Sequence, residues 1–534
     1  MYVMHTIGGE PQVRAIDYFD RGHDRNPARL AVIDVQTGMR ASFADVKARS
    51  EAIAAAMQAH GFANQDSVAL YAPNSALLMV TLLAIWRANG KWIPVNIRNA
   101  IDANAGYLNY VRCSWMFYHS SLSDEVDELR RQCPGLTRLV CLDRDDRGVP
   151  SLEAFIGERT AAAFSPPPVD AFGNLDELVG IFPTGGTTGP SKGANVTNLG
   201  WGTMIETAAD AMGGRTDAPV ALVSAPITHA AGPIALASLS LGATQVILPG
   251  FDAERVLQTI SKHRVTHMYL PPTALYQLLA SPEIRQHDLT SLKIFILVGS
   301  PVSPEKLRLA VEAFGPCLCQ AYGQVECPMI VTWLPPEIVA AAAAGDHSER
   351  LASCGRPTRS VQVGIMDDAG RLLPPGEAGE IVVRGALVSH SYFEMPEATA
   401  EIRTHGWHHT GDVAKFDADG FVYIVDRKKD MVVSGGFNVY TAEVEAAITE
   451  LPGVRECAVI GIPHDKWGEQ VHAIVVAAGA DAAGIIAHAK ARLGGVKAPK
   501  SVEFVETIPR TAAGKMDKKS LRRAHWGGVE RMVN

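Results

Sequence analysis

Residues 183–193 read Pro-Thr-Gly-Gly-Thr-Thr-Gly-Pro-Ser-Lys-Gly and directly follow the apolar segment Leu178–Phe182. In such a turn, backbone N–H groups and hydroxyl side chains can converge on a phosphate, and Lys192 adds positive charge. The spacing fits neither the Walker A pattern G-x-x-x-x-G-K-[ST] nor the dinucleotide pattern G-x-G-x-x-G. A flexible surface linker is the alternative, but linkers rarely follow a buried strand and end in a basic residue. The segment therefore predicts a phosphate-binding loop.

Strand and helix patterns alternate on both sides of this loop. Ser42 and Asp45 form a capping box that opens a helix, and Gly61 closes that helix. The alternation predicts an α/β fold with doubly wound, mostly parallel sheets. The elements expected most clearly are the strands Ser67–Tyr71, Trp92–Val95, Leu178–Phe182 and Phe295–Val298 and a helix over residues 76–89.

The pattern changes near Gly355. Short alternating strands at Val361–Met366, Glu380–Arg384 and Phe421–Val425 predict a small β-barrel or sheet. After residue 426 the pattern returns to α+β, with a helix that takes Thr441 as its N-cap. We therefore expect a large domain over residues 1–426, with two βα subdomains to about residue 355 and a β-barrel over 356–425. A small, mobile C-terminal domain is expected over 427–534.

Composition limits the class of protein. The 534 residues include 49 Lys+Arg and 57 Asp+Glu, a formal net charge of −8, which argues against a nucleic-acid binder. The eight cysteines form no CxxC pair, as expected for reduced thiols in the cytoplasm. Residues 218–251 carry no Asp, Glu, Lys or Arg, but prolines and glycines interrupt them, so we expect a buried strand, helix and strand. Neither a cleaved signal nor an integral membrane segment is expected.

Six spaced motifs in one order give the chain a resemblance to a known superfamily. The loop at 183–193 resembles the phosphate loop of the adenylate-forming superfamily, which includes acyl-CoA synthetases, aryl-CoA ligases, luciferases and peptide-synthetase adenylation domains. The other motifs follow up to residue 515, and the resemblance extends over nearly the whole chain. It implies an ATP- or AMP-binding loop made by Thr184, Gly185, Gly186, Thr187, Thr188, Gly189 and Lys192.

The segment Gln320–Glu326 resembles the superfamily motif Y-G-x-T-E. The resemblance implies an adenine site made by Ala321, Tyr322, Gly323 and, across the ring, the backbone of Gly299, Ser300 and Pro301. An ordinary turn at a strand end is the alternative for residues 299–301. Glu326 and Thr184 would hold Mg²⁺ on the phosphates. Val325 replaces the usual Thr, so we expect a lower rate or altered geometry rather than lost activity.

The segment His408–Asp412 resembles the motif Y-x-T-G-D, with His408 at the Tyr position. The resemblance implies that Asp412 accepts both ribose hydroxyls of the nucleotide. An aspartate that only stabilises a β-turn is the alternative. A metal site made by His408 and His409 is disfavoured, because adjacent residues on a strand point to opposite faces.

Residues 426–438 resemble the superfamily's hinge and the glycine turn of its small domain. Arg427 would reach the ribose and phosphates, and Lys429 matches the hinge about which that domain rotates. The CoA side would be formed by Gly435, Gly436 and Phe437. A solvated run of charges is the alternative for residues 427–429.

Two further motifs carry the chemistry. The segment 509–515 resembles P-x-T-x-x-G-K, which implies that Lys515 is the catalytic cation where two anions meet in the transition state. The segment 226–232 resembles the wall of the acyl pocket, with His229, Ala230 and Gly232. A hydrogen-bonded core histidine is the alternative for His229. The small residues leave room for a sizeable acyl group, and the lack of Arg or Lys disfavours a dicarboxylate.

The expected function is that of an ATP-dependent acid–thiol ligase in the cytoplasm. Its partners would be Mg·ATP, a carboxylic acid and CoA, with a lean to medium- or long-chain fatty acids. An aryl-CoA ligase and an enzyme that loads a separate carrier protein are the alternatives, and a degenerate nucleotide-binding regulator is the non-enzyme alternative. The sequence leaves the oligomeric state open, a homodimer included.

Overall fold

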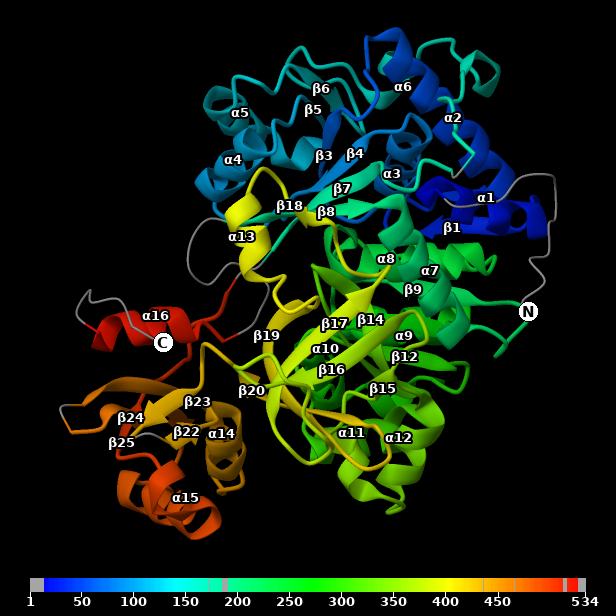
Figure 1. Cartoon of the computed structure of the whole chain (residues 1–534). Coiled ribbons are helices and arrows are strands. Elements are labelled where there is room, and N and C mark those ends of the chain that lie inside the picture. The colour runs from blue at the N-terminus through cyan, green and yellow to red at the C-terminus, as the bar shows by residue number, and fades with distance from the viewer. Residues whose placement is uncertain are drawn as a thin grey trace. The chain divides into compact units, whose positions relative to one another are not determined.

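The computed structural model describes residues 14–171, 173–184, 191–435, 437–464, 466–511 and 516–526. The chain divides into two compact units (Figure 1). The first contains residues 1–362 and 383–406, and the second contains residues 363–382 and 407–534. Each unit is a mixed α/β structure. In the described residues, no helix combines the length and the apolar character needed to cross a membrane.

The first unit contains a nine-stranded mixed sheet. Its inner strands run parallel, and β13 and β14 form an antiparallel hairpin near one edge. In spatial order the strands are β15 (Arg356–Pro357), β14 (Cys327–Leu334), β13 (Leu318–Gln324), β12 (Ile294–Leu297), β11 (His267–Leu270), β9 (Val220–Val223), β10 (Thr244–Ile247), β1 (Leu30–Asp34) and β2 (Arg40–Ser42).

A seven-stranded sheet forms the other half of this unit. Its core is parallel; at one edge β8 pairs antiparallel with β7, and β18 pairs antiparallel with β8. In order the strands are β18 (Ser391–Tyr392), β8 (Gly193–Thr197), β7 (Leu178–Pro183), β4 (Lys91–Pro94), β3 (Ser67–Tyr71), β5 (Trp115–Tyr118) and β6 (Arg138–Cys141). The doubly wound α/β prediction is confirmed by both sheets.

Helices pack between the two sheets. Helices α3 (Ala76–Arg87) and α7 (Asn198–Met212) each contact strands of both sheets, and α8 (Gly232–Ser240) packs on β9 and β10. The uncharged run at 218–251 is therefore the buried β9–α8–β10 unit that its sequence predicts. The remaining helices are α1 (Ala15–Arg25), α2 (Phe43–Ala59), α4 (Ile101–Tyr110), α5 (Ser123–Gln132), α6 (Leu152–Ile156), α9 (Ala253–His263), α10 (Pro272–Ala280), α11 (Pro304–Phe314), α12 (Pro336–Ala343) and α13 (Pro396–Glu401).

Local signals fix helix α2 as predicted. Ser42 is its N-cap and accepts a hydrogen bond from Asp45 N, while the Asp45 carboxylate accepts one from Ser42 N. The helix ends just before Gly61, whose φ of 85° lies in the left-handed region that glycine tolerates.

The second unit holds two smaller sheets. The first, predicted as a small barrel or sheet, is a four-stranded sheet of β16 (Val361–Met366), β17 (Gly379–Gly385), β19 (His408–Phe416) and β20 (Val422–Arg427). The second has five strands, β22 (Phe437–Val439), β21 (Val432–Ser434), β24 (Gly468–Ala477), β23 (Val454–His464) and β25 (Ser501–Phe504). Its helices are α14 (Thr441–Thr449), α15 (Ala482–Lys497) and α16 (Lys518–His525).

The predicted N-cap of α14 is wrong. Thr441 is the first helical residue, and Tyr440 at the N-cap position makes no side-chain cap. The Thr441 hydroxyl instead donates to the buried Asp426 carboxylate at 2.9 Å. The Thr441 hydroxyl, which the local sequence pattern assigned to capping α14, is thus bound by Asp426, fifteen residues earlier in the chain.

Candidate active site

The phosphate-loop motif connects β7 and β8. These strands pair antiparallel as far as Pro183 and Gly193, and Thr184 N donates to the Lys192 carbonyl at 2.8 Å. Thr184 itself is buried. Residues Gly185, Gly186, Thr187, Thr188 and Gly189 lie outside the described residues. The described ends of the loop are therefore those of a closed hairpin, and the phosphate-binding roles stay predictions.

Three charged and aromatic side chains meet beside this hairpin. Glu326 lies in the tight turn between β13 and β14, is 7% exposed, and accepts a 2.6 Å hydrogen bond from the Tyr392 hydroxyl. Lys192 Nζ lies 5.0 Å from the centroid of the Tyr392 ring. Burial and the nearby Glu326 charge raise the pKa of Tyr392, so its hydroxyl keeps the proton that it donates. Tyr392 thus links the end of the predicted phosphate loop to the predicted metal ligand.

The oxygen donors at this place fit Mg²⁺. Glu326 offers a buried carboxylate and Thr184 a hydroxyl, and Mg²⁺ prefers such hard oxygen ligands together with substrate phosphates and water. Tyr392 orients one carboxylate oxygen, as outer-shell partners of metal ligands do. Glu326 and Thr184 remain the predicted ligands.

The predicted adenine site lies at the ends of two neighbouring parallel strands. Phe295 on β12 pairs with Leu318 on β13, so residues 299–301 and Tyr322 both lie at the carboxyl edge of the sheet, where ligands of such sheets bind. Tyr322 is buried, whereas Gly299, Ser300 and Pro301 are exposed. At Gly323 an added Cβ would lie 2.6 Å from the Met329 backbone nitrogen. This hairpin packing alone requires glycine, and a role of Gly323 in nucleotide binding stays a prediction.

His229 lies in a π-helical turn, Ile227–Ala231, that precedes α8. Its side chain is exposed, so the alternative of a core histidine is wrong. Its Nδ1 lies 3.2 Å from Thr228 Oγ1. Surrounding protein atoms and the charge of Arg98 lower the pKa of His229. Arg98 from another segment therefore lies near the turn at residues 226–232, which has no Arg or Lys of its own.

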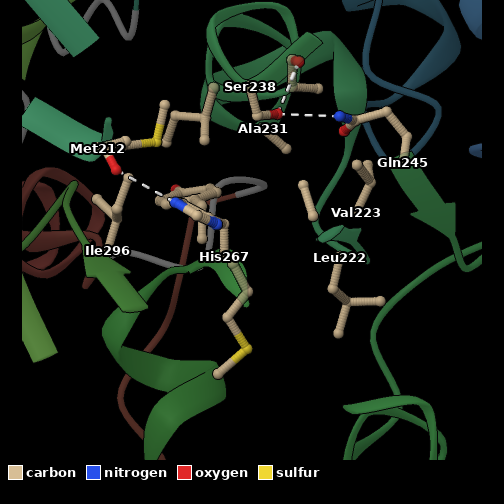
Figure 2. A pocket seen from close by; sticks show the side chains of 13 residues that line it. Met212, Leu222, Val223, Ala231, Ser238, Gln245, His267 and Ile296 are labelled. Carbon is tan, nitrogen blue, oxygen red and sulfur yellow. Dashed lines mark hydrogen bonds between the residues drawn. The ribbon is translucent and has the colours of Figure 1, made fainter. Parts of the chain in front are cut away.

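A small cavity of about 10 Å³ continues from this turn between α8 and the nine-stranded sheet. Ala231, Ile234 and Ala235 form one wall, and β9 and β11 form the other (Figure 2). Figure 2 shows Gln245 donating to Ser238, at 3.0 Å, and His267 facing the Met212 carbonyl, at 3.3 Å. The lining is mostly apolar, and the volume suffices for about one water.

The small residues Gly232 and Ala230 near this turn are small for different reasons. A Cβ on Gly232 would lie 2.3 Å from the Ile227 carbonyl oxygen, so the tight turn requires glycine there. Ala230 has no such restriction and is partly exposed. The predicted acyl-pocket residues His229, Ala230 and Gly232 thus lie on one turn at the end of the cavity that Ala231 lines.

In the second unit, two predicted nucleotide contacts face each other. Asp412 on β19 pairs with Arg427 on β20, and Arg427 Nε lies 3.7 Å from Asp412 Oδ1. Gly411 before them has a φ of 72°, which few residues other than glycine adopt. The turn therefore presents a carboxylate and a guanidinium side by side.

A buried carboxylate that sequence reasoning missed holds this turn. Glu380 on β17 accepts hydrogen bonds from Gly411 N at 2.9 Å and faces His409 Nδ1 at 3.0 Å. Burial raises the pKa of Glu380, but these hydrogen bonds and the charge of Lys428 outweigh it and lower that pKa overall. His408 is buried, while His409 reaches Glu380, so the two rings do not form a shared metal site. The only signal in the sequence was a charged residue just before the apolar run Ile381–Val383 of this strand.

The hinge residue Lys429 and the glycine Gly435 occupy turns, and Phe437 begins β22. Lys429 lies in the turn between β20 and β21, and burial and the charge of Arg427 lower its pKa. Gly435 has a φ of 58° and donates its N–H to the Trp467 carbonyl at 2.9 Å. Phe437 is 61% exposed, unusual for so large an apolar side chain. Gly436 lies outside the described residues.

Lys515 also lies outside the described residues, but its flanks are fixed. Arg510 and Met516 form an antiparallel bridge. Lys518 at the start of α16 makes a 2.6 Å ion pair with Glu445 and donates to Thr441 at 2.7 Å. The charges of Glu445, Asp426 and Asp430 raise the pKa of Lys518 despite its burial. Sequence motifs did not mark Lys518, Glu380, Tyr392 or Arg98.

Two family models match the chain. The model described as AMP-binding enzyme matches residues 19–393, and the model described as AMP-binding enzyme C-terminal domain matches residues 443–515.

Curated relatives share these regions. The chain is 40% identical over 386 residues to the medium/long-chain-fatty-acid–CoA ligase FadD8 of Mycobacterium tuberculosis, over 70% of the chain and 66% of FadD8. It is 35% identical over 498 residues to the feruloyl-CoA synthase of an Amycolatopsis species, over 91% of the chain and 94% of that relative. Among solved structures, the amide bond synthetase McbA from Marinactinospora thermotolerans superposes with a TM-score of 0.85 at 30% identity, covering 96% of this chain and 99% of McbA.

Proposed function

The chain belongs to the AMP-binding enzyme family, among the acyl-CoA ligases, and we propose that it joins an apolar carboxylic acid to CoA through an acyl-adenylate. The observation that carries the proposal is the cluster in which Tyr392 connects Lys192 to the carboxylate of Glu326. A cation and a metal-binding carboxylate beside one loop suit the triphosphate of Mg·ATP. Family membership as an enzyme also argues against a regulator with a degenerate site.

In the first half-reaction, a carboxylate oxygen of the acid attacks the α-phosphorus of ATP, and the bond to the β-phosphate breaks. Pyrophosphate leaves and acyl-AMP remains. Lys192 neutralises phosphate charge, and Asp412 accepts hydrogen bonds from the ribose hydroxyls. Mg²⁺, when held by Glu326 and Thr184, neutralises charge on the phosphates. Lys515 supplies the cation where the two anions approach.

In the second half-reaction, the sulfur of CoA attacks the acyl carbon. The bond to AMP breaks, the thiol proton departs and AMP leaves. We propose that residues from Lys429 onward turn about that residue between the two steps, so that the segment with Lys515 withdraws and the turn with Gly435 and Phe437 receives the thiol arm. The exposed aromatic ring of Phe437 beside a glycine turn supports this assignment.

The acid is proposed to be a medium- or long-chain fatty acid. The apolar lining of the cavity between α8 and β9 supports an aliphatic tail, as does the similarity to a ligase named for medium- and long-chain fatty acids. A long chain would require α8 to move, because the cavity has room for only about one water. The similarity to a feruloyl-CoA synthase favours an aryl acid as the second candidate, whose ring would also require α8 to move.

The acceptor is proposed to be CoA, in the cytoplasm where ATP and CoA are abundant. A separate carrier protein carries the same thiol and is the alternative. The similarity of the fold to an amide bond synthetase makes an amine a third acceptor to test, because an amine attacks the same acyl carbon.

The experiment separates the two half-reactions. Purified protein is mixed with ATP, Mg²⁺ and one acid from a panel of short, medium, long and aromatic carboxylic acids, and pyrophosphate is measured. We expect a stoichiometric burst of pyrophosphate with apolar acids and continuous turnover once CoA is added, with the thioester identified by mass spectrometry. Parallel reactions contain a phosphopantetheinylated carrier protein or an amine instead of CoA. Absence of pyrophosphate with every acid would refute the proposal, and amide without thioester would reassign the acceptor.

A further inference from the structure

Three potential metal ligands converge in the second unit, and none of them belongs to a motif used above. His472 lies on β24, Glu503 on β25 and His525 at the end of α16. Their ligating atoms all lie within 4.8 Å of one another. His472 Nε2 is 3.5 Å from Glu503 Oε2, and His525 Nε2 is 3.4 Å from the same oxygen.

These distances suit a shared ion better than hydrogen bonds. Both nitrogen–oxygen separations exceed the usual range of roughly 2.7–3.2 Å for an N–H···O bond. Zinc bound tetrahedrally at about 2.0–2.1 Å from nitrogen and oxygen places its ligand atoms roughly 3.3 Å apart. The carboxylate oxygen therefore already lies close to the required distance from each ring. The two imidazole nitrogens lie no more than 4.8 Å apart, and rotation of the partly exposed His525 would bring them to the same separation.

His472 is positioned to offer a ring nitrogen to a metal. Its residue is 5% exposed, and its Nε2, within the described part of the chain, has no hydrogen-bond partner. Its Nδ1 lies 2.7 Å from Ser501 Oγ, and Ser501 Oγ accepts a hydrogen bond from Gln470 Nε2 at 3.3 Å. When Nδ1–H donates to Ser501 Oγ, the ring proton is on Nδ1 and the Nε2 lone pair points at the cluster, as in metal-binding histidines whose other ring nitrogen donates to an outer-shell partner.

We propose that His472 Nε2, Glu503 and His525 Nε2 bind a divalent transition-metal ion of the zinc class. Two imidazoles and one carboxylate are a donor set that such ions prefer, with a water as the fourth ligand, whereas Mg²⁺ prefers oxygen donors alone. The site shares no residue with the predicted magnesium ligands Glu326 and Thr184. It does not depend on the proposed acid or acceptor.

Binding would tie three separate segments together. β24 and β25 pair as parallel strands, with His472 aligned to Ser501, and α16 packs on the same sheet through Trp526, which donates to the Gly461 carbonyl at 3.0 Å. An ion held by all three elements would oppose the loss of α16 from the sheet. Because the unfolded chain does not hold the ligands together, the ion would stabilise the folded state.

The test uses the full chain without a histidine tag, titrated with ZnCl₂ in the presence of excess Mg²⁺. We expect one Zn²⁺ per chain, a rise of the unfolding midpoint by several degrees at saturating Zn²⁺, and, for Co²⁺, the visible absorption of a tetrahedral complex. His525→Ala and Glu503→Gln are expected to weaken Zn²⁺ binding at least about tenfold. His488→Ala, which removes another partly exposed histidine of the same unit, is the matched control and should bind as the wild type does.

The outcomes separate cleanly. Wild-type protein that binds no Zn²⁺ in excess Mg²⁺ would overturn the proposal. Equal binding by wild type and His525→Ala would overturn it as well, because the ion would then sit elsewhere. Both substitutions lie at partly exposed positions, and unchanged far-ultraviolet circular dichroism without metal establishes that the variants fold.

Discussion

Asp412 and Arg427 stand opposite each other on adjacent antiparallel strands, with Arg427 Nε 3.7 Å from Asp412 Oδ1. The motif that ends at Asp412 and the motif that begins at residue 426 thereby lie side by side in the second unit. The ion pair is partly exposed, so its own contribution to folding stability is small. We propose instead that the pair presents a carboxylate and a guanidinium to the ribose and phosphates of the nucleotide.

Asp412→Asn is expected to raise the KM for ATP about 100-fold, because an amide replaces an ionised acceptor of two hydroxyl groups. The KM for the acid should change little. Asp419→Asn, an exposed aspartate in the turn of the same hairpin, is the control and should leave both constants unchanged. Steady-state pyrophosphate release at varied ATP provides the measurement. An unchanged KM for ATP would mean that Asp412 serves only the turn.

Tyr392→Phe is expected to raise the Mg²⁺ concentration for half-maximal pyrophosphate release about tenfold, because Glu326 loses the donor that orients it. The ring remains, so contacts with Lys192 and Val325 persist. Tyr423→Phe removes a similar hydroxyl-to-carboxylate hydrogen bond at Asp417 and should not alter the Mg²⁺ requirement. If both variants behave as wild type in a Mg²⁺ titration, Tyr392 does not orient a metal ligand.

Local signals account for what sequence reasoning predicted correctly. The strand Ser67–Tyr71 and the helix capped by Ser42 follow from nearest-neighbour patterns, and the structure confirms both. Motif residues at strand ends, such as Thr184 and Tyr322, lie where the alternation of strands and helices places them.

Long-range contacts explain what the sequence could not reveal. Tyr392 reaches Glu326 across 66 residues because β18 pairs with β8, and no residue pattern marks a two-residue edge strand. The charge of Arg98, which lies in a loop distant in sequence, lowers the pKa of His229. Asp426 accepts the hydrogen bond of the Thr441 hydroxyl, which a local pattern had assigned to capping a helix. Each case depends on a partner that only the folded chain supplies.

Val325→Thr is expected to give equal or higher turnover, because it restores the hydroxyl usual at this motif position. In this chain Val325 packs against Tyr392 and Ala398, and Thr has nearly the same shape. The added hydroxyl is expected to cost about 1 kcal/mol of stability. Turnover and urea unfolding are compared with Val325→Ala, which shortens the side chain without adding a hydroxyl. A large fall in turnover for the Thr variant alone would show that valine is an adaptation of this site.

Glu380→Gln is expected to destabilise the second unit by about 1–3 kcal/mol at pH 7. The neutral amide is a weaker hydrogen-bond acceptor for His409 and Gly411 than the ionised carboxylate that it replaces. The folded state lowers the pKa of Glu380, so its stabilisation is present above the unfolded pKa and is lost as pH falls through the folded one. The difference between variant and wild type should therefore shrink below about pH 4.3. Urea unfolding at several pH values tests this, with the exposed Glu377→Gln as control. A difference that stays constant with pH would contradict the linkage.

Lys515→Ala is expected to lower the rate of acyl-adenylate formation by about 10²–10³-fold, because the cation that meets two approaching anions is lost. Thioester formation from supplied acyl-AMP should survive, since no anion attacks phosphorus in that step. The flanking anchors, the bridge of Arg510 with Met516 and the ion pair of Lys518 with Glu445, do not involve the substituted side chain. The segment should therefore keep its attachment to the unit.

Lys519→Ala is the matched control, because it removes a lysine four residues further on. It should support both half-reactions at the wild-type rate. Single-turnover measurements of pyrophosphate and of thioester separate the two steps for each variant. Equal loss of both half-reactions in Lys515→Ala would show that the lysine serves the whole cycle, and the proposed withdrawal of its segment before thiol attack would then be wrong.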